Sequence, residues 1–172
     1  MAKLNNTVMF ACNQGGHFSQ MMALHDLFGK YNTVLVTDNV RANKEMKSLQ
    51  DIGEIEYALA MANDRRKNAG KGKNNGRLTS INAYISLFVE EKKLWDKYRP
   101  AVIVSTGSNI AVPLFIYGKL RGTKLIFIET RAKVYARSLT GILVRYLANQ
   151  IFVQWPEMLK LYPEAKYCGT LV

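Results

Sequence analysis

Short apolar runs alternate along this chain with longer segments of helical pattern, and this alternation restricts the fold more than any other feature of the sequence. The short runs are apolar on both faces, whereas the segments between them carry apolar residues at helical spacing. This combination is typical of a parallel sheet with helices on both faces. We therefore expect an α/β fold with a Rossmann-like parallel sheet. The predicted strands are 7–11, 33–37, 55–59, 101–105, 124–128 and 150–153, and the predicted helices are 18–28, 41–50, 80–98, 110–121 and 138–148.

The size and charge of the chain indicate one domain with an anionic partner. Its 172 residues, of which 48% are hydrophobic, suffice for one domain with a sizeable core, so 1–172 is predicted to be a single unit. A formal net charge of +11 favours phosphates, nucleic acid or an acidic lipid surface. Cys12 and Cys168 lack paired spacing, which favours a reducing cytoplasm over a disulfide or metal framework. Neither a signal peptide nor a membrane-spanning segment is expected.

Gly15, Gly16 and His17 follow the first predicted strand and precede the first predicted helix. In parallel sheets of this kind, ligands bind at the carboxyl ends of the strands. Two glycines let the backbone approach a ligand, and free amides at a helix start favour an anion. His17 is a candidate general base because imidazole titrates near working pH. The alternative is a plain tight turn in which His17 orients the loop, and the spacing is not the G-x-G-x-x-G dinucleotide fingerprint.

Polar residues also follow two later strands of the prediction. Ser105, Thr106, Gly107, Ser108 and Asn109 form a small turn whose amides and hydroxyls suit an anion or a sugar, and equally suit capping of the next helix.

Glu129 and Arg131 follow the fifth predicted strand. They place a carboxylate and a guanidinium at the edge of the sheet where ligands bind. The alternative is that the two residues form a local salt bridge.

The segment 63–77 holds six basic residues, one acidic residue and three glycines, which predicts a flexible basic loop over 63–79. The helix after it carries more apolar residues than one stripe needs. A cationic loop beside surplus apolar surface suits an interfacial membrane contact, and a core helix with a solvated loop is the alternative. The predicted membrane contacts are Arg65, Arg66, Lys67, Lys71, Lys73, Arg77, Tyr84 and Phe88. No nucleic-acid partner is expected, because no aromatic platform is interleaved with the basic residues.

Several blocks of sequence carry a resemblance that covers nearly the whole chain. They are 15–17, 105–107, 127–129, 138–141, 162–163 and 169–172, together with the most specific one, Phe-Val-Gln-Trp-Pro-Glu at 152–157. In these blocks the chain resembles the acceptor-side, membrane-associated subunit of two-part glycosyltransferases. That family includes the eukaryotic subunit of the enzyme that adds the second N-acetylglucosamine to dolichol diphosphate sugar, and bacterial capsule or exopolysaccharide proteins.

The resemblance implies the amino-terminal half of a GT-B glycosyltransferase, with a partner chain supplying the other half and the UDP-sugar site. The sequence stops where single-chain relatives enter their second domain, which fits this division. In the single-chain relative that adds N-acetylglucosamine to lipid I, a Gly-Gly-His turn faces the acceptor diphosphate. His17 falls on that histidine and Glu129 on an acidic residue of the acceptor pocket, so both are the expected catalytic residues. The eukaryotic subunit's amino-terminal transmembrane helix has no counterpart here, which points to a bacterial member.

These expectations describe one subunit of a heteromeric, UDP-sugar-dependent, inverting transferase at the inner face of the cell membrane. It would bind a polyprenyl-diphosphate-linked saccharide, and a donor-binding subunit would hold the UDP-sugar. No cofactor or catalytic metal is expected. The alternatives are a non-catalytic recruiter of a partner glycosyltransferase and a free-standing nucleotide-sugar or nucleic-acid binding domain. The expected acceptor-binding residues are Gly15, Gly16, Ser105, Thr106, Gly107, Ser108, Asn109 and Arg131.

Overall fold

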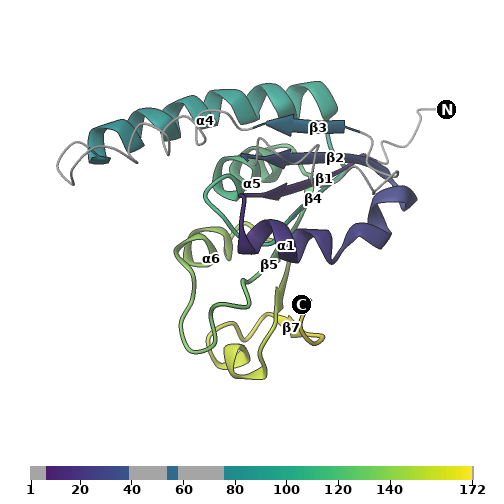
Figure 1. Ribbon diagram of the computed structural model, residues 1–172, viewed down its shortest axis with the longest axis vertical. Helices are drawn as coiled ribbons and strands as arrows, with labels where there is room; N and C mark the ends of the chain where they lie inside the picture. Colours follow the sequence, from purple (N-terminus) through teal and green to yellow (C-terminus); the bar gives the residue numbers. More distant parts are fainter. Residues whose placement is uncertain (1–6, 39–53, 58–75, 172) are drawn as a thin grey trace.

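The protein folds around one parallel sheet of seven strands in the order β3-β2-β1-β4-β5-β6-β7 (Figure 1). The structure is a computed structural model that describes residues 7–38, 54–57 and 76–171. The strands are β1 (Thr7–Cys12), β2 (Asn32–Thr37), β3 (Glu54–Tyr57), β4 (Val102–Ser105), β5 (Lys124–Ile128), β6 (Gln150–Val153) and β7 (Lys166–Tyr167). The α-helices are α1 (Gly16–Met22), α4 (Gly76–Tyr98), α5 (Ala111–Leu120) and α6 (Leu139–Val144), and the 3-10 helices are η1 (His25–Lys30) and η2 (Pro156–Lys160).

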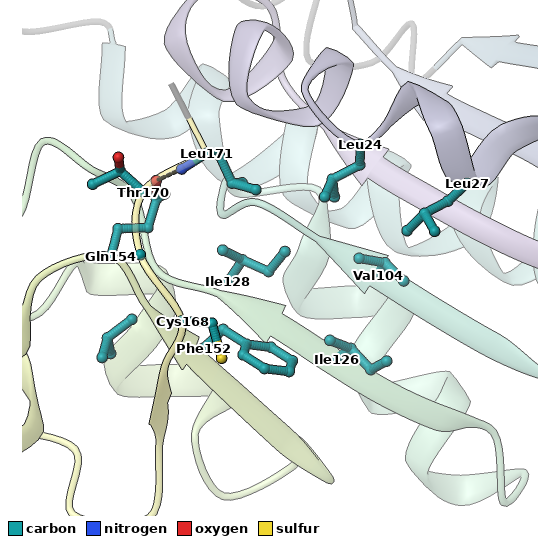
Figure 2. Close-up of a pocket in the computed structure, with 12 residues that line it drawn as sticks. Leu24, Leu27, Val104, Ile126, Ile128, Phe152, Gln154, Cys168, Thr170 and Leu171 are labelled. Carbon is teal, nitrogen blue, oxygen red and sulfur yellow. Dashed lines mark hydrogen bonds between the residues drawn. The ribbon is translucent and has the colours of Figure 1, made fainter.

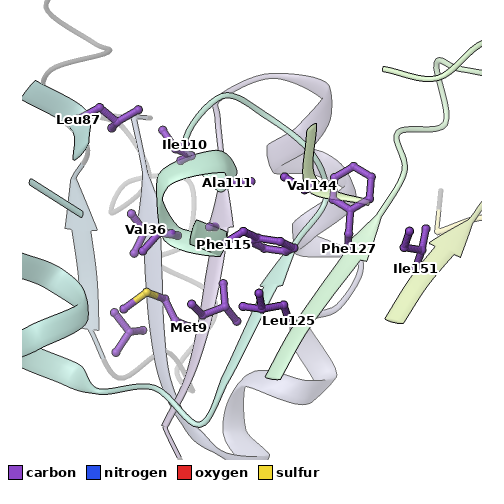
Figure 3. Packing of buried hydrophobic residues seen from close by; sticks show 14 of the residues in the cluster. Met9, Val36, Leu87, Ile110, Ala111, Phe115, Leu125, Phe127, Val144 and Ile151 are labelled. Carbon is purple, nitrogen blue, oxygen red and sulfur yellow. The ribbon is translucent and has the colours of Figure 1, made fainter. Parts of the chain in front are cut away.

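The core has two parts because successive strand residues face opposite sides of the sheet. On one side, Met9 and Ala11 of β1 belong to a cluster that α4, α5, α6 and η2 complete. Figure 3 shows Phe115 of α5 within this cluster, and its ring lies 6.4 Å from that of Phe127 in β5. On the other side, Val8 and Phe10 of β1 pack with residues of α1 and η1. The sheet is therefore covered on both faces, as the sequence predicts.

The predicted fold class is confirmed, and the differences are local. All six predicted strands are present within two residues of their expected bounds, and β7, of only two exposed residues, was not predicted. α4 begins at Gly76, inside the segment that we expected to be a loop. The predicted helix at 41–50 and most of the basic loop lie outside the described residues.

The first predicted helix is split into α1 and η1 for a reason that lies in its apolar spacing. Continuing α1 would place His25 on the same helical stripe as Phe18 and Met21. The break after Met22 instead leaves His25 exposed and turns Phe28 into the core, where it is 1% exposed. The break therefore keeps the histidine in solvent while the phenylalanine stays buried.

The sheet order reverses between β1 and β4, which are hydrogen-bonded neighbours. From β1 the chain proceeds outward to β2 and β3, and from β4 it proceeds the other way to β7. In open α/β sheets the crevice outside such a reversal is where ligands bind. The turns that follow β1 and β4 therefore lie at the position where this fold places its binding site.

Candidate functional site

The turns after β1 and β4 are joined by a reciprocal pair of hydrogen bonds between His17 and Thr106. His17 Nδ1 lies 2.8 Å from the carbonyl oxygen of Thr106, and the hydroxyl of Thr106 donates to the carbonyl oxygen of His17 at 2.8 Å. The two residues are 89 positions apart in the chain. The structure thus brings the predicted site residues of these two turns together where the sheet order reverses.

The contact with Thr106 fixes the tautomer of His17. A carbonyl oxygen only accepts hydrogen bonds, so Nδ1 carries the proton and the neutral ring has its lone pair on Nε2. The ring is half-buried, so it keeps access to solvent. His17 is therefore held in the form in which Nε2 can accept a proton.

The glycines of the two turns serve different purposes. Gly15 and Gly107 have positive φ angles of 84° and 92°, a conformation that favours glycine. A Cβ on Gly107 would also lie 3.0 Å from Cε1 of His17, so this glycine makes room for the ring. Gly16 has neither constraint, since its φ is not positive and an added Cβ would have no described protein atom within 4 Å. The space above Gly16 is therefore open to an approaching ligand.

The turn after β4 corrects part of the predicted acceptor site. The hydroxyl of Ser105 donates to the carbonyl oxygen of Ala11 at 2.8 Å and accepts the amide of Gly107 at 3.2 Å. Ser105 and Thr106 are both fully buried. We expected these hydroxyls to hold the acceptor, but internal partners use them, so they hold the turn against β1 and α1 instead.

Ser108 and Asn13 differ from these neighbours because each has a buried polar atom without a hydrogen-bond partner. Within the part of the chain that the structure describes, neither Oγ of Ser108 nor Oδ1 of Asn13 has one. Asn13 is oriented by Asp38, whose carboxylate accepts from its Nδ2 at 2.9 Å, so Oδ1 cannot exchange places with Nδ2 without facing a carboxylate. An unpaired buried polar atom is costly, which makes both atoms candidates for bonding a ligand. Asn109 is half-buried at the end of the same turn.

Glu129 lies below the surface at the end of β5, 1% exposed, and its carboxylate has four hydrogen-bond donors. Oε1 accepts the amide of Thr130 at 2.8 Å, and Oε2 accepts the hydroxyl of Tyr162 at 2.7 Å and the amide and hydroxyl of Ser138 at 3.1 and 3.0 Å. The expectation that Glu129 is an alternative base needs correction, because this carboxylate is enclosed and saturated. It orders the loop between β5 and α6.

Gly141 of α6 allows the Glu129 cluster to close. An added Cβ there would lie 2.1 Å from the hydroxyl oxygen of Tyr162 and 2.5 Å from Oε2 of Glu129. Burial and the neighbouring Glu129 carboxylate raise the pKa of Tyr162 above its usual range, so the phenol stays protonated and donates. Ser138 adds a helix cap, since its hydroxyl accepts the amide of Gly141 at 2.9 Å.

Two buried glutamines that the sequence analysis did not select connect the loops. Gln20 of α1 accepts hydrogen bonds from the amide of Arg131 at 3.0 Å and from the side chain of Gln154. Gln154, directly after β6, also donates to the carbonyl oxygen of Glu129 and accepts the amide of Leu171, both at 2.9 Å. The resemblance included Gln154 in its most specific block, and that was the available signal. Arg131 itself is exposed at the site edge.

An apolar cavity of about 270 Å³ lies on the α1 side of the sheet (Figure 2). Leu24 and Leu27 form one wall and Ile126 and Phe152 of the sheet form another, while the chain from Cys168 to Leu171 passes along its edge. No sequence feature predicted this cavity.

The predicted membrane contacts divide into described and undescribed residues. Tyr84 and Phe88 of α4 are half-buried, with Tyr84 against the core and the Phe88 ring 6.2 Å from that of Tyr117. Among the described side chains of this helix, the exposed large apolar ones are instead Ile85 and Val89. Arg65, Arg66, Lys67, Lys71 and Lys73 lie outside the described residues, and Arg77 lies in α4 without a described side chain.

The described ranges contain neither a membrane-spanning helix nor a metal-binding cluster. None of their helices is long and apolar enough to cross a membrane. They also contain no group of three or more His, Cys, Asp or Glu residues placed to hold a metal ion.

The fold is that of the amino-terminal half of GT-B glycosyltransferases. The chain is similar to MurG of Acinetobacter baumannii, with a TM-score of 0.61 and 14% identity over 88% of this chain and 42% of that structure. It is also similar to UDP-GlcNAc 2-epimerase of Methanocaldococcus jannaschii, with a TM-score of 0.62 and 11% identity over 95% of this chain and 45% of that structure. The chain thus spans less than half of either solved structure.

The sequence comparison identifies the family. The model of the family described as "Oligosaccharide biosynthesis protein Alg14 like" matches residues 8–171, and the chain belongs to this family. It is 26% identical to the UDP-N-acetylglucosamine transferase subunit ALG14 of Yarrowia lipolytica over 98% of this chain and 82% of that protein. It is 36% identical to the subunit of the same name from Candida albicans over 55% of this chain and 46% of that protein.

Proposed function

We propose that this chain is the acceptor-binding subunit of a two-component inverting glycosyltransferase that acts on a polyprenyl-diphosphate-linked saccharide. The observation that carries the proposal is His17, whose Nε2 has no partner among the described residues and which lies where the sheet order reverses. A transferase needs a base at its acceptor site, because the attacking hydroxyl must lose its proton as it forms the new bond.

In the proposed reaction, Nε2 of His17 takes the proton of the acceptor hydroxyl. The hydroxyl oxygen forms a bond to the anomeric carbon of the donor, and the bond from this carbon to the phosphate oxygen of UDP breaks, so UDP leaves and the configuration inverts. The Gly15–His17 backbone would bind the acceptor diphosphate, and the unpaired Ser108 hydroxyl would bond the acceptor. Asn109 and Arg131 remain proposed contacts to the acceptor at the edge of the site. Glu129 would position the loop between β5 and α6.

The donor site is proposed to lie on a second subunit. The relatives reported above are named as subunits of a UDP-N-acetylglucosamine transferase, which supports a glycosyltransferase partner and makes UDP-N-acetylglucosamine the first donor to test. We also propose that the chain works at the cytoplasmic surface of the cell membrane. A bacterial capsule or exopolysaccharide pathway stays a prediction, since the two relatives reported above are fungal.

The test measures sugar transfer from radiolabelled UDP-sugars to lipid-linked acceptor with this chain alone, the candidate donor subunit alone, and both together. We expect transfer that requires both chains or is greatly increased by combining them. Full activity of the donor subunit alone, unchanged when this chain is added, would overturn the proposal.

A recruiter without catalytic residues is the second candidate function. It is supported by the enclosed position of Glu129, which leaves His17 as the one described residue with a proposed catalytic role. Recruitment predicts that both chains are needed and that replacing His17 changes the rate little.

A further inference from the structure

α6 carries an apolar stripe that faces away from the protein. Leu139, Ile142 and Leu143 of α6 are 69, 47 and 51% exposed, and Tyr146, in the turn directly after α6, is 77% exposed. The four residues lie at helical spacings i, i+3, i+4 and i+7. Tyr135, in the loop before the helix, is 81% exposed. Residues at these spacings share one face of a helix, and such a stripe normally faces a core.

The opposite face of α6 is firmly attached. Val144 is fully buried in the core, Gly141 packs against Glu129 and Tyr162, and Ser138 caps the first turn. The outward direction of the stripe is thus fixed by contacts on the inner face. In Figure 1, α6 lies to the left of β5 and follows the loop that leaves this strand.

The segment that carries the stripe is basic. The segment 130–149 contains four basic residues and no acidic residue. Arg131 and Lys133 are exposed. Arg145 pairs with Glu164 at 3.2 Å, and Arg137 donates to the carbonyl oxygen of Leu161. Leucine and isoleucine with tyrosines and exposed cations beside them match the needs of an acidic lipid surface.

A lipid surface fits this stripe better than a protein partner does. A stable protein interface covers about 800 Å² on each partner, which one exposed face of a six-residue helix cannot supply. Shallow insertion into lipid requires only a few apolar side chains with cations nearby.

We propose that α6 and the loop before it form a membrane-contact surface that inserts between acidic lipid headgroups beside the acceptor site. This inference rests on the proposed function, because the role of the surface would be to hold the acceptor site close to the membrane that contains the lipid-linked acceptor. It replaces the half-buried Tyr84 and Phe88 as the apolar part of the contact.

The test is co-sedimentation of the full chain with phosphatidylcholine vesicles that do or do not contain phosphatidylglycerol. The variant Leu139→Gln/Leu143→Gln removes two exposed side chains, and glutamine preserves helix propensity. Leu120→Gln, at a leucine of α5 that is 76% exposed, is the matched control. Ile85→Gln/Val89→Gln tests the exposed face of α4.

We expect wild type to bind the acidic vesicles and lose binding as salt is added, because exposed cations are screened. The α6 variant should bind at least about tenfold more weakly, and Leu120→Gln should bind like wild type. Wild type that does not bind, an α6 variant that binds like wild type, or loss of binding only in the α4 variant would overturn the inference. Neither sugar nor donor subunit is present, so failure here is distinct from failure of transfer.

Discussion

The carboxyl edge of the sheet has two halves that are built in opposite ways. At β1 and β4, Gly16 faces open space, and Oγ of Ser108 lacks a partner among the described residues. At β5 and β6, the carboxylate of Glu129 has four donors, and Gly141 has no room for a Cβ. The first half therefore has bonding capacity left for a ligand, whereas the second has used its capacity to hold loops and α6 in place.

The comparison separates two kinds of polar residue that look alike in a sequence. His17 and Glu129 both follow a strand, yet of the two only His17 keeps a side-chain atom without a partner among the described residues. The surroundings of a residue, rather than its type or its place after a strand, decide whether it can take part in chemistry.

The largest expected effect on activity comes from a substitution in the half at β1 and β4, the open half. His17→Ala should lower transfer by the complete two-subunit enzyme by about 10²- to 10⁴-fold, the usual contribution of a general base. Its unfolding free energy should change by only about 1 kcal/mol, since one half-buried hydrogen bond is lost. Initial rates and thermal unfolding of the same preparation check both parts. Activity within about threefold of wild type would instead support the recruiter.

A pair of glycine variants compares the halves directly. Gly141→Ala should destabilise the fold by roughly 3 kcal/mol, because its Cβ would displace Tyr162 and Glu129. Gly16→Ala should leave stability unchanged within about 0.5 kcal/mol and weaken acceptor binding. Urea unfolding and acceptor titration separate these outcomes. Equal destabilisation by both variants would remove the distinction between the halves.

Two serines of one turn give a smaller contrast. Ser105→Ala should cost about 1–2 kcal/mol of stability, because it leaves buried partners of its hydroxyl unsatisfied. Ser108→Ala should cost nothing, since its hydroxyl has no partner among the described residues, and should weaken acceptor binding by about tenfold. If Ser108→Ala proves the more destabilising, its hydroxyl belongs to the closed network.

The smallest expected effect is on the pH dependence of stability and comes from Glu91. This residue is also a control, because it has unpaired buried polar atoms away from the proposed site. It is fully buried in α4, and neither carboxylate oxygen has a hydrogen-bond partner among the described residues. Burial raises its pKa well above the usual value, so the folded state keeps a proton that the unfolded state releases. Stability should therefore fall as pH rises above about 4.3, the ordinary glutamate pKa, until the raised folded pKa is passed.

Glu91→Gln should remove most of this pH dependence and raise stability near neutral pH by about 1 kcal/mol, with unchanged transfer. Thermal unfolding across the pH series checks it. A variant with the wild-type slope would show that another group causes the dependence.

Much of the fold could be predicted from local patterns, but the closed half of the site could not. Six strands could be predicted because a strand that is buried on both faces appears in the sequence as a short run of apolar residues. β7 could not be predicted in this way, since Lys166 and Tyr167 are exposed. The position of His17 at the carboxyl edge of the sheet was predictable from a strand followed by two glycines. The saturation of Glu129 depends on Tyr162, which is 33 residues away, and the Gln20–Gln154 bond spans 134 residues, so only the folded chain reveals them.

The most direct test of the two-halves account is a backbone-amide NMR titration of the chain with N-acetylglucosaminyl diphosphate carrying a short prenyl chain. The account predicts shifts at Gly16, His17 and Ser108, with Thr130 and Gly141 unmoved. Shifts confined to Thr130 and Gly141, with Gly16 and His17 unmoved, would contradict it.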